Sequence, residues 1–233
     1  MAIGMRRLLA LDARSDAAEL LDSGRLSLAE VEANLVDLAR LNRLPGGTDA
    51  SAHGIARLVG SRTAARVLDV GTGAGDMPLA FARRGWHVVA TDVNPHVLRI
   101  ARARLADVAA VEVIEGDVLA LPLGDASVDV AHCSLLLHHL PPESAVAALR
   151  ELRRVARHGV VVNDLRRGLL PLAATWVSVT ALCRSPITGV DGMASARRAY
   201  TIAELDGLLA EAGLTVRWRS PAWLPRVVTT ASA

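Results

Sequence analysis

The chain has 233 residues, of which 52% are apolar, enough for one α/β domain with a modest extension and a sizeable core. The formal net charge is +2, and all 26 basic residues are arginines spread along the sequence, so we expect no nucleic-acid partner. The two cysteines form no CxxC pair and no His/Cys cluster with metal spacing, so the sequence predicts neither a disulfide framework nor a metal site.

We expect neither a signal peptide nor a membrane span. The apolar stretch within residues 1–10 is too short for a signal peptide. The longest apolar stretch, residues 168–183, is interrupted by Pro171 and falls short of the roughly 20 residues that a membrane helix needs. The sequence therefore predicts a cytoplasmic protein.

Residues 15–60 are expected to be helical. Ser27 and Glu30 form a capping-box pattern, in which each side chain accepts a hydrogen bond from the other residue's backbone amide. Leucines and a valine then recur at helical spacing. Residues 45–49 break this pattern before a further short helix at about 50–59.

From residue 64 the sequence alternates between strand and helix patterns. The expected strands are 65–70, 86–91, 111–115, 128–134 and 159–165, and the helices between them are 78–84, 95–105 and 143–157. Near-continuous apolar strands that alternate with helices indicate a parallel sheet covered on both faces.

The last third of the chain departs from this alternation. Residues 166–200 are apolar and helix-like, but proline and glycine interrupt them. A second capping box opens a helix at Thr201 that ends near Gly213, and strands at 214–219 and 226–230 close the sheet.

Together these elements predict a Rossmann-like α/β fold with a seven-stranded, mostly parallel sheet and helices on both faces. We expect an N-terminal helical extension at 1–60, a main domain at 61–233 and a lid insertion at about 166–200. Exposed apolar helices in the extension could pair two chains, so a homodimer is one expectation.

A glycine-rich loop joins the first strand to the following helix. The segment VLDVGTGAGD, residues 67–76, places Gly71, Gly73 and Gly75 where the backbone must turn sharply and where a ligand can approach closely. A purely structural turn would also explain glycines here. Their spacing differs from the G-x-G-x-x-G of dinucleotide-binding proteins.

Acidic residues end the next two strands. Asp92 lies 21 residues after Gly71, where a carboxylate can accept both ribose hydroxyls of a nucleoside cofactor. Asp117 ends the third strand, where it could accept the adenine amino group. Because parallel strands end at one edge of the sheet, these groups converge on one crevice, although each carboxylate alone could be a cap or turn residue.

These motifs resemble those of class I S-adenosylmethionine-dependent methyltransferases, which carry an acidic residue before G-x-G-x-G, an acid after strand two and a G-D pair after strand three. The resemblance is strong over residues 64–165 and weak elsewhere. It implies methyl transfer from S-adenosylmethionine, with S-adenosylhomocysteine as the product. The cofactor-binding residues it implies are Asp69, Gly71, Gly73 and Gly75 at the methionine part, Asp92 at the ribose, Asp117 and Val118 at the adenine, and also Thr72, Val93 and Ser134.

The segment after the fourth strand carries two adjacent histidines. CSLLLHHLP, residues 133–141, looks like the L-x-H-H-L pattern of type 11 and quinone-biosynthesis methyltransferases, where this segment lines the acceptor site. Histidine titrates near pH 6.5, which suits it to take a proton from a hydroxyl, so His139 and next His138 are candidate bases. Alternatively, one histidine packs and bonds a backbone carbonyl. Asp164, after strand five, is a further candidate base, or else it caps the next turn.

The lid suggests the acceptor's character. Its apolar helices favour a hydrophobic acceptor, which Arg166, Trp176 and Tyr200 are predicted to contact, although the lid's apolar residues could simply pack as core. Residues 38–43 resemble the start of small methyltransferases encoded beside polyketide-type pathways. That resemblance implies that Asn42 or the arginine after it contacts the methionine carboxylate.

The sequence therefore predicts an O-methyltransferase of a small hydrophobic, aromatic or polyketide-like acceptor in secondary metabolism. A quinone-type C-methyltransferase carries similar motifs, and a non-catalytic module that only binds the cofactor is another alternative. The glycine spacing argues against an NAD-dependent oxidoreductase. The lack of a basic stripe argues against an RNA or protein methyltransferase.

Overall fold

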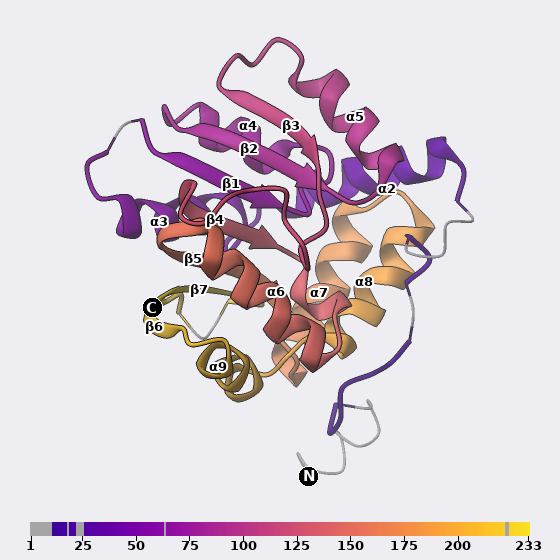
Figure 1. Cartoon of the computed structure of the whole chain (residues 1–233). Coiled ribbons are helices and arrows are strands. Elements are labelled where there is room, and N and C mark those ends of the chain that lie inside the picture. Colours follow the sequence, from indigo (N-terminus) through magenta and orange to yellow (C-terminus); the bar gives the residue numbers. More distant parts are fainter. Residues whose placement is uncertain (1–10, 18, 22–25, 63, 222–223) are drawn as a thin grey trace.

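A seven-stranded sheet forms the centre of the molecule, with the strand order β3-β2-β1-β4-β5-β7-β6 (Figure 1). The computed structural model describes residues 11–17, 19–21, 26–62, 64–221 and 224–233. The strands are β1 (Arg66–Val70), β2 (His87–Asp92), β3 (Val111–Glu115), β4 (Val128–Ser134), β5 (Ala156–Leu165), β6 (Thr215–Arg219) and β7 (Arg226–Ser232). β1 to β5 pair in parallel, and β7 lies antiparallel between β5 and β6. The predicted seven-stranded, mostly parallel α/β fold is confirmed.

The strand order reverses between β1 and β4. From β1 the chain moves outward through β2 and β3 and then returns to the other side of β1 as β4. Where the order reverses, the connections leave the two strands in opposite directions, and a crevice opens at their carboxyl ends. The topology thus fixes the place of a ligand site before any side chain is considered.

Helices cover both faces of the sheet. On one face α3 (Thr48–Val59) and α4 (Asp76–Ala82) bring Ile55 and Phe81 against strand valines such as Val161. On the other face lie α6 (Pro142–Val155) and α9 (Ile202–Glu211).

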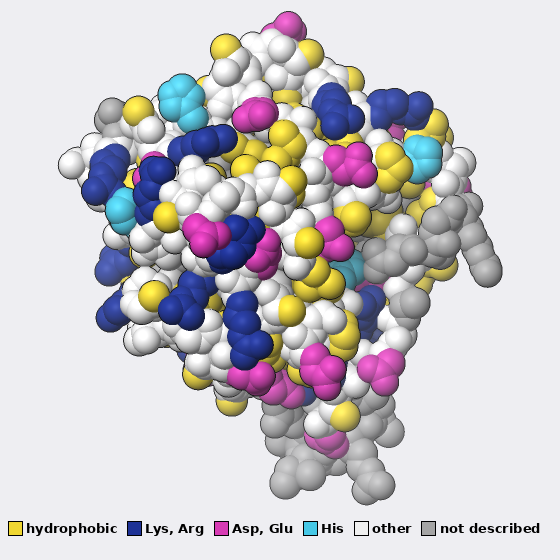
Figure 2. Space-filling model, viewed as in Figure 1, with side chains coloured by type: hydrophobic (Ala, Val, Ile, Leu, Met, Phe, Trp, Pro, Cys, Tyr) yellow, Lys and Arg dark blue, Asp and Glu magenta, His cyan; other side chains and the backbone are white. Residues whose placement is uncertain are grey.

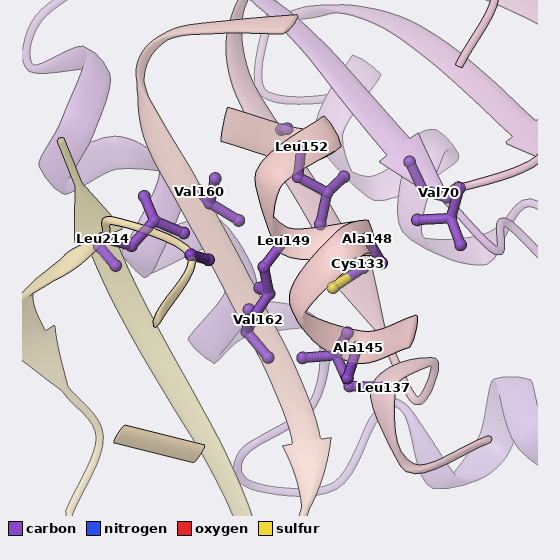
Figure 3. Packing of buried hydrophobic residues seen from close by; sticks show 14 of the residues in the cluster. Val70, Cys133, Leu137, Ala145, Ala148, Leu149, Leu152, Val160, Val162 and Leu214 are labelled. Carbon is purple, nitrogen blue, oxygen red and sulfur yellow. The ribbon is translucent and has the colours of Figure 1, made fainter. Parts of the chain in front are cut away.

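Figure 3 shows how α6 packs on the sheet. Leu149 and Leu152 of α6 lie against Val160 and Val162 of β5, with Cys133 of β4 beside them. All five side chains are at most 1% exposed. The apolar residues of α6 recur every three or four positions, so a single stripe of the helix faces the sheet.

Three helices gather at the end of the sheet where β1 to β5 finish, as Figure 1 shows for α2, α7 and α8. Their bounds are α2 Leu28–Leu41, α7 Leu169–Leu182 and α8 Pro186–Arg198. We call these three helices the cap. α7 and α8 occupy the predicted lid, and they pack on each other and on α2. α5 (Pro95–Leu105) contacts β2, β3 and α2.

The N-terminal segment differs from its prediction. The helices expected within 15–60 are present as α2 and α3, but residues 11–17 and 19–20 form no helix. The amides of Leu20 and Leu21 donate to the carboxylate of Asp191 in α8, at 2.8 and 3.0 Å. We call residues 11–17 and 19–21 the strap. The domain boundary at residue 60 stays a prediction; α3 packs on the sheet.

Two further element boundaries differ by a few residues. α4 begins at Asp76 instead of residue 78, because Gly75 adopts a left-handed conformation and starts the helix there. β5 begins at Ala156, directly after α6, because this residue already pairs with Val128 of β4.

On the face shown in Figure 2, arginines lie dispersed among acidic and uncharged side chains. Within the described ranges, none of the helices combines the length and apolar character that crossing a membrane demands. The absence of a nucleic-acid partner stays a prediction.

Candidate functional site

A cavity of about 540 Å³ lies at the carboxyl ends of the central strands, beneath the cap. Strand-end loops line one side, and the cap, the strap and η2 (Leu137–His139) line the other. Nine of the ten predicted cofactor residues reach it. They are Asp69, Gly71, Thr72, Gly73, Asp92, Val93, Asp117, Val118 and Ser134.

The glycine loop needs its glycines for two different reasons. Gly71 and Gly73 have φ of +70° and +55°, a conformation that costs other residues energy, and both line the cavity. Gly75, the tenth predicted residue, does not line it. A Cβ at Gly75 would lie 2.6 Å from Leu105 Cδ1, so this glycine leaves room for the side chain at the end of α5.

The two acids after β2 and β3 lie in different environments. Asp92 accepts hydrogen bonds from the amides of Gly73 (3.3 Å) and Asn94 (3.0 Å), and burial raises the pKa of its carboxyl. Asp117 is exposed and accepts from the amide of Leu119 at 2.9 Å. Both carboxylates line the same cavity, as the sequence predicts.

Asp69 is bonded mainly to the protein itself. Its carboxylate accepts from the Thr72 hydroxyl at 2.8 Å and lies 2.6 Å from His132 Nδ1. His132 Nε2 in turn lies 2.9 Å from the Ser51 hydroxyl of α3. This buried chain fixes the glycine loop to the sheet and to α3. Sequence reasoning missed His132, although a histidine within an apolar central strand was a visible signal.

A buried arginine also reaches the cavity and was missed. Arg226 at the start of β7 donates to Asn163 Oδ1 (3.0 Å), Asn42 Oδ1 (2.6 Å) and the Ser134 hydroxyl (2.7 Å). Burial lowers its pKa to about 10, so the guanidinium stays charged at neutral pH. A cation on the wall of a cavity suits a carboxylate ligand. The signal was an arginine that opens an otherwise apolar strand.

Asn42 was expected to contact the methionine carboxylate. It lines the cavity, and its Nδ2 donates to Asp76 Oδ2 at 2.9 Å. Its side-chain oxygen accepts from Arg226. Asn42 therefore joins the C-terminal end of the cap helix α2 to the strand ends.

The two histidines after β4 both line the cavity but differ in environment. Leu135, with φ of +54°, turns the chain away from β4 and into η2. His138 is buried, its Nδ1 2.6 Å from Asp164 Oδ1 and its Nε2 3.5 Å from Glu19 Oε1. Burial alone lowers the pKa of His138, but these two carboxylates outweigh burial and raise it to about 9.

These contacts separate the three predicted bases. With a pKa near 9, His138 already carries its proton at neutral pH and cannot take another. Asp164 does not line the cavity. Burial raises its pKa, but the imidazolium of His138 outweighs burial and lowers it. His139 is partly exposed, with Nε2 3.7 Å from Glu19 Oε2, and stays the predicted base.

The three predicted acceptor contacts lie outside the cavity. Arg166 donates to the carbonyl of Leu224 (3.0 Å), and the buried Tyr200 hydroxyl donates to the carbonyl of Leu140 (2.6 Å). Trp176 is 57% exposed. The cap packs with a different face of α7 turned inward, since Thr175, Ser178 and Val179 line the cavity. The sequence shows which side chains are large but not how the helix is rotated.

Polar groups from the cap and strap complete the far wall. Asn34 of α2 lines the cavity, and its Oδ1 is buried without a hydrogen-bond partner in the described part of the chain. Glu19 of the strap accepts from the Ser195 hydroxyl of α8 at 2.6 Å. Between these polar groups the wall is apolar, with leucines at 35, 38 and 41. This side of the cavity therefore suits a ligand with an apolar body and few polar atoms.

Comparison with known proteins shows what this chain is similar to. Residues 67–159 match a family model described as a methyltransferase domain. A malonyl-[acyl-carrier protein] O-methyltransferase of Serratia marcescens is 35% identical over 149 residues, which cover 59% of this chain and 56% of that protein. A ubiquinone/menaquinone biosynthesis C-methyltransferase of Burkholderia mallei is 35% identical over 120 residues, covering 48% and 47% respectively.

A solved structure extends the likeness to the whole fold. The crystal structure of a SAM-dependent methyltransferase from Aquifex aeolicus superposes with a TM-score of 0.64, at 20% identity, and covers 89% of this chain and 98% of that one. At this identity the likeness shows the shared fold alone. The chain spans about half the length of the curated relatives it matches.

Proposed function

We propose that this chain, in which residues 67–159 form a methyltransferase domain, is an S-adenosylmethionine-dependent methyltransferase that acts on a small molecule. The observation that carries the proposal is the cavity. Its strand-end side presents the left-handed Gly71 and Gly73 together with Asp92, within the matched segment.

The residues present fit S-adenosylmethionine. Gly71 and Gly73 have no side chain, so a ligand at the cavity wall can contact their backbone directly. A Cβ at Gly71 would lie 3.0 Å from Leu136 Cδ1, so there is little space for a side chain there. Asp92 would accept the ribose hydroxyls, and Arg226 supplies a positive charge for the methionine carboxylate. When bound, the cofactor supplies an electrophilic methyl group on a sulfonium.

The adenine end of the cofactor would lie between two valines. Val93 after β2 and Val118 after β3 both line the cavity, and Val93 is 64% exposed, which leaves its side chain available to a ligand. Asp117, next to Val118, would accept the adenine amino group. Contact with the adenine would shield the exposed side chain of Val93 from water.

We further propose that the acceptor is a small, hydrophobic, aromatic or polyketide-like molecule methylated on oxygen. The apolar wall fits its body, and Asn34 Oδ1 and His139 supply the polar contacts. O-methylation needs removal of a hydroxyl proton, and His139 can accept one at Nε2, whereas His138 is held protonated. A role in secondary metabolism, a cytoplasmic location and a homodimer stay predictions.

Calorimetry tests the cofactor assignment. Purified protein should bind S-adenosylmethionine and S-adenosylhomocysteine, and it should not bind NAD. Binding of NAD alone would overturn the assignment.

Product analysis tests the chemistry. Incubation with methyl-labelled cofactor and a panel of phenols, hydroxylated polyketides and quinols should label an oxygen of one acceptor class. Label on ring carbon would select the C-methyltransferase instead. Cofactor binding without label on any acceptor would favour the non-catalytic module.

A further inference from the structure

Three potential metal ligands meet at the acceptor end of the cavity. Glu19 comes from the strap, and His138 and His139 come from η2, more than a hundred residues further along the chain. All three line the cavity. Among the residues that the structure describes, this is the group of His, Cys, Asp and Glu side chains close enough to share an ion.

The spacing of the ligand atoms suits a divalent transition metal. His138 Nε2 lies 3.5 Å from Glu19 Oε1, and His139 Nε2 lies 3.7 Å from Glu19 Oε2. One ligand atom from each residue lies within 4.8 Å of the other two. Bonds of about 2.0–2.2 Å around a tetrahedral ion separate its ligands by roughly 3.3–3.6 Å, so a pair of ligand atoms at the 4.8 Å limit would have to move closer by about 1.2–1.5 Å.

The surrounding groups orient the ligands as in protein metal sites. Asp164 bonds His138 Nδ1 at 2.6 Å, which leaves Nε2 of that ring to face Glu19. The Ser195 hydroxyl donates to Glu19 Oε1 at 2.6 Å and holds the carboxylate in place. A carboxylate on the far nitrogen of a ligating histidine fixes the ring and makes it a stronger ligand.

The charge around the cluster is mixed. Arg198 Nη1 lies 3.6 Å from Glu19 Oε1, and its Nη2 donates to the carbonyl of His139 at 2.8 Å. Against this cation stand the carboxylates of Glu19 and Asp164. Arg14 adds a second cation, because its Nη2 donates to the carbonyl of His138 at 2.5 Å. With neutral histidines the two carboxylates and the two guanidiniums cancel, and a bound ion would replace the proton that His138 carries in its absence.

We propose that Glu19, His138 and His139 bind one divalent transition-metal ion, for which zinc fits the donor set of two imidazoles and one carboxylate. Three protein ligands leave a fourth position open, and here it opens to the cavity. An oxygen of the acceptor would bind there, a role that rests on the proposed function. A hydroxyl bound to the ion has a lowered pKa and releases its proton to water.

This site gives His139 and the strap a definite role. His139 would act on the acceptor through the ion instead of taking its proton directly. Glu19 would tie the strap to η2, so that the ion closes the acceptor end of the cavity. The sequence predicted no metal here because Glu19 lies so far from the histidines along the chain.

Metal binding by the full chain tests the proposal. Protein freed of metal with a chelator is titrated with Zn²⁺ by calorimetry and with Co²⁺ by visible absorption. We expect one ion per chain and the intense absorption of four-coordinate Co²⁺. Glu19→Gln and His139→Ala should each weaken metal binding at least about 10-fold. The control is His96→Ala, which removes an exposed histidine of α5 and should leave metal binding unchanged.

The outcomes separate this inference from the proposed function. The absence of one-to-one binding, or equal affinity in all three variants, would overturn the metal site. Binding of S-adenosylmethionine is measured on the same metal-free samples. Cofactor binding without metal binding rejects the metal site alone, and metal binding without cofactor binding rejects the proposed function but supports the site.

Discussion

The two sides of the cavity are built in different ways. On the strand-end side the contact between the glycine loop and the acid after β2 is short-range: the amide of Gly73 bonds Asp92, only 19 residues away. On the cap side they are long-range: the amide of Leu20 bonds Asp191, 171 residues away, and Glu19 faces His139. The first side follows from a strand-turn-helix unit. The second exists only once the strap, η2 and the cap have come together.

This difference corresponds to the two proposed roles of the cavity, which are cofactor binding and the choice of acceptor. The strand-end side carries the features that match a methyltransferase domain, whereas the cap lies outside the matched residues. Proteins that share a fold differ in function through the residues of their sites. The cap would therefore determine which acceptor binds.

Arg226→Ala should have the largest effect, because Arg226 connects the two sides through Ser134, Asn163 and Asn42. Its loss leaves the buried Asn42 and Asn163 without these hydrogen bonds, at a cost of about 1–3 kcal/mol for each buried group. We expect unfolding free energy in urea to fall by about 2–5 kcal/mol. Arg217→Ala, at an exposed arginine, is the control and should change it by less than about 0.5 kcal/mol. Equal losses in both variants would contradict the connecting role.

His139→Ala tests the cap side alone. Removing the imidazole that faces the acceptor should lower turnover roughly 100-fold, while calorimetric affinity for S-adenosylmethionine stays within about two-fold. Wild-type turnover in this variant would refute any role of His139 in catalysis. A matching loss of cofactor affinity would show that the two sides are not separable.

Asp92→Ala tests the strand-end side. Without this carboxylate the ribose hydroxyls would lack a hydrogen-bond acceptor. Binding of S-adenosylmethionine, measured by calorimetry, should therefore weaken by about 1–3 kcal/mol. Asp117→Ala should cost less, because that carboxylate is exposed and water can replace it. The opposite order would place the nucleoside differently in the cavity.

The pH dependence of cofactor affinity follows from the same carboxylate. Burial raises the pKa of the Asp92 carboxyl. As the pH falls, the ionised carboxylate that would accept hydrogen bonds from the ribose is therefore lost at a higher pH than it would be for an exposed aspartate. Affinity should therefore be complete well above this raised pKa and fall as the pH is lowered through it. Asp92→Asn should flatten this part of the profile, and an unchanged profile would assign the titration to another group.

Trp176→Ala should have the smallest effect. Trp176 lies on the outer side of α7, 57% exposed and away from the cavity. We expect a change of less than about 0.5 kcal/mol in unfolding free energy and unchanged turnover. A large loss of turnover would show that the outer face of the cap takes part in acceptor binding, against the arrangement described above.

The sequence alone determined the sheet, its helices and the strand-end side of the cavity. Periodicity and glycine spacing are local properties, and parallel strands bring their carboxyl ends together whatever the rest of the chain does. Gly71, Gly73, Asp92 and Asp117 could therefore be placed correctly on the cavity wall.

The arrangement of the cap side, by contrast, depends on how the folded elements pack together. Which face of α7 points inward, and so whether Thr175 or Trp176 meets a ligand, depends on packing against two other helices. The different environments of His138 and His139 depend on Glu19 and Asp164, which contact the pair from other segments of the chain. Contacts between residues far apart in sequence leave no periodic trace, since they are set by how preformed elements pack and not by their own patterns.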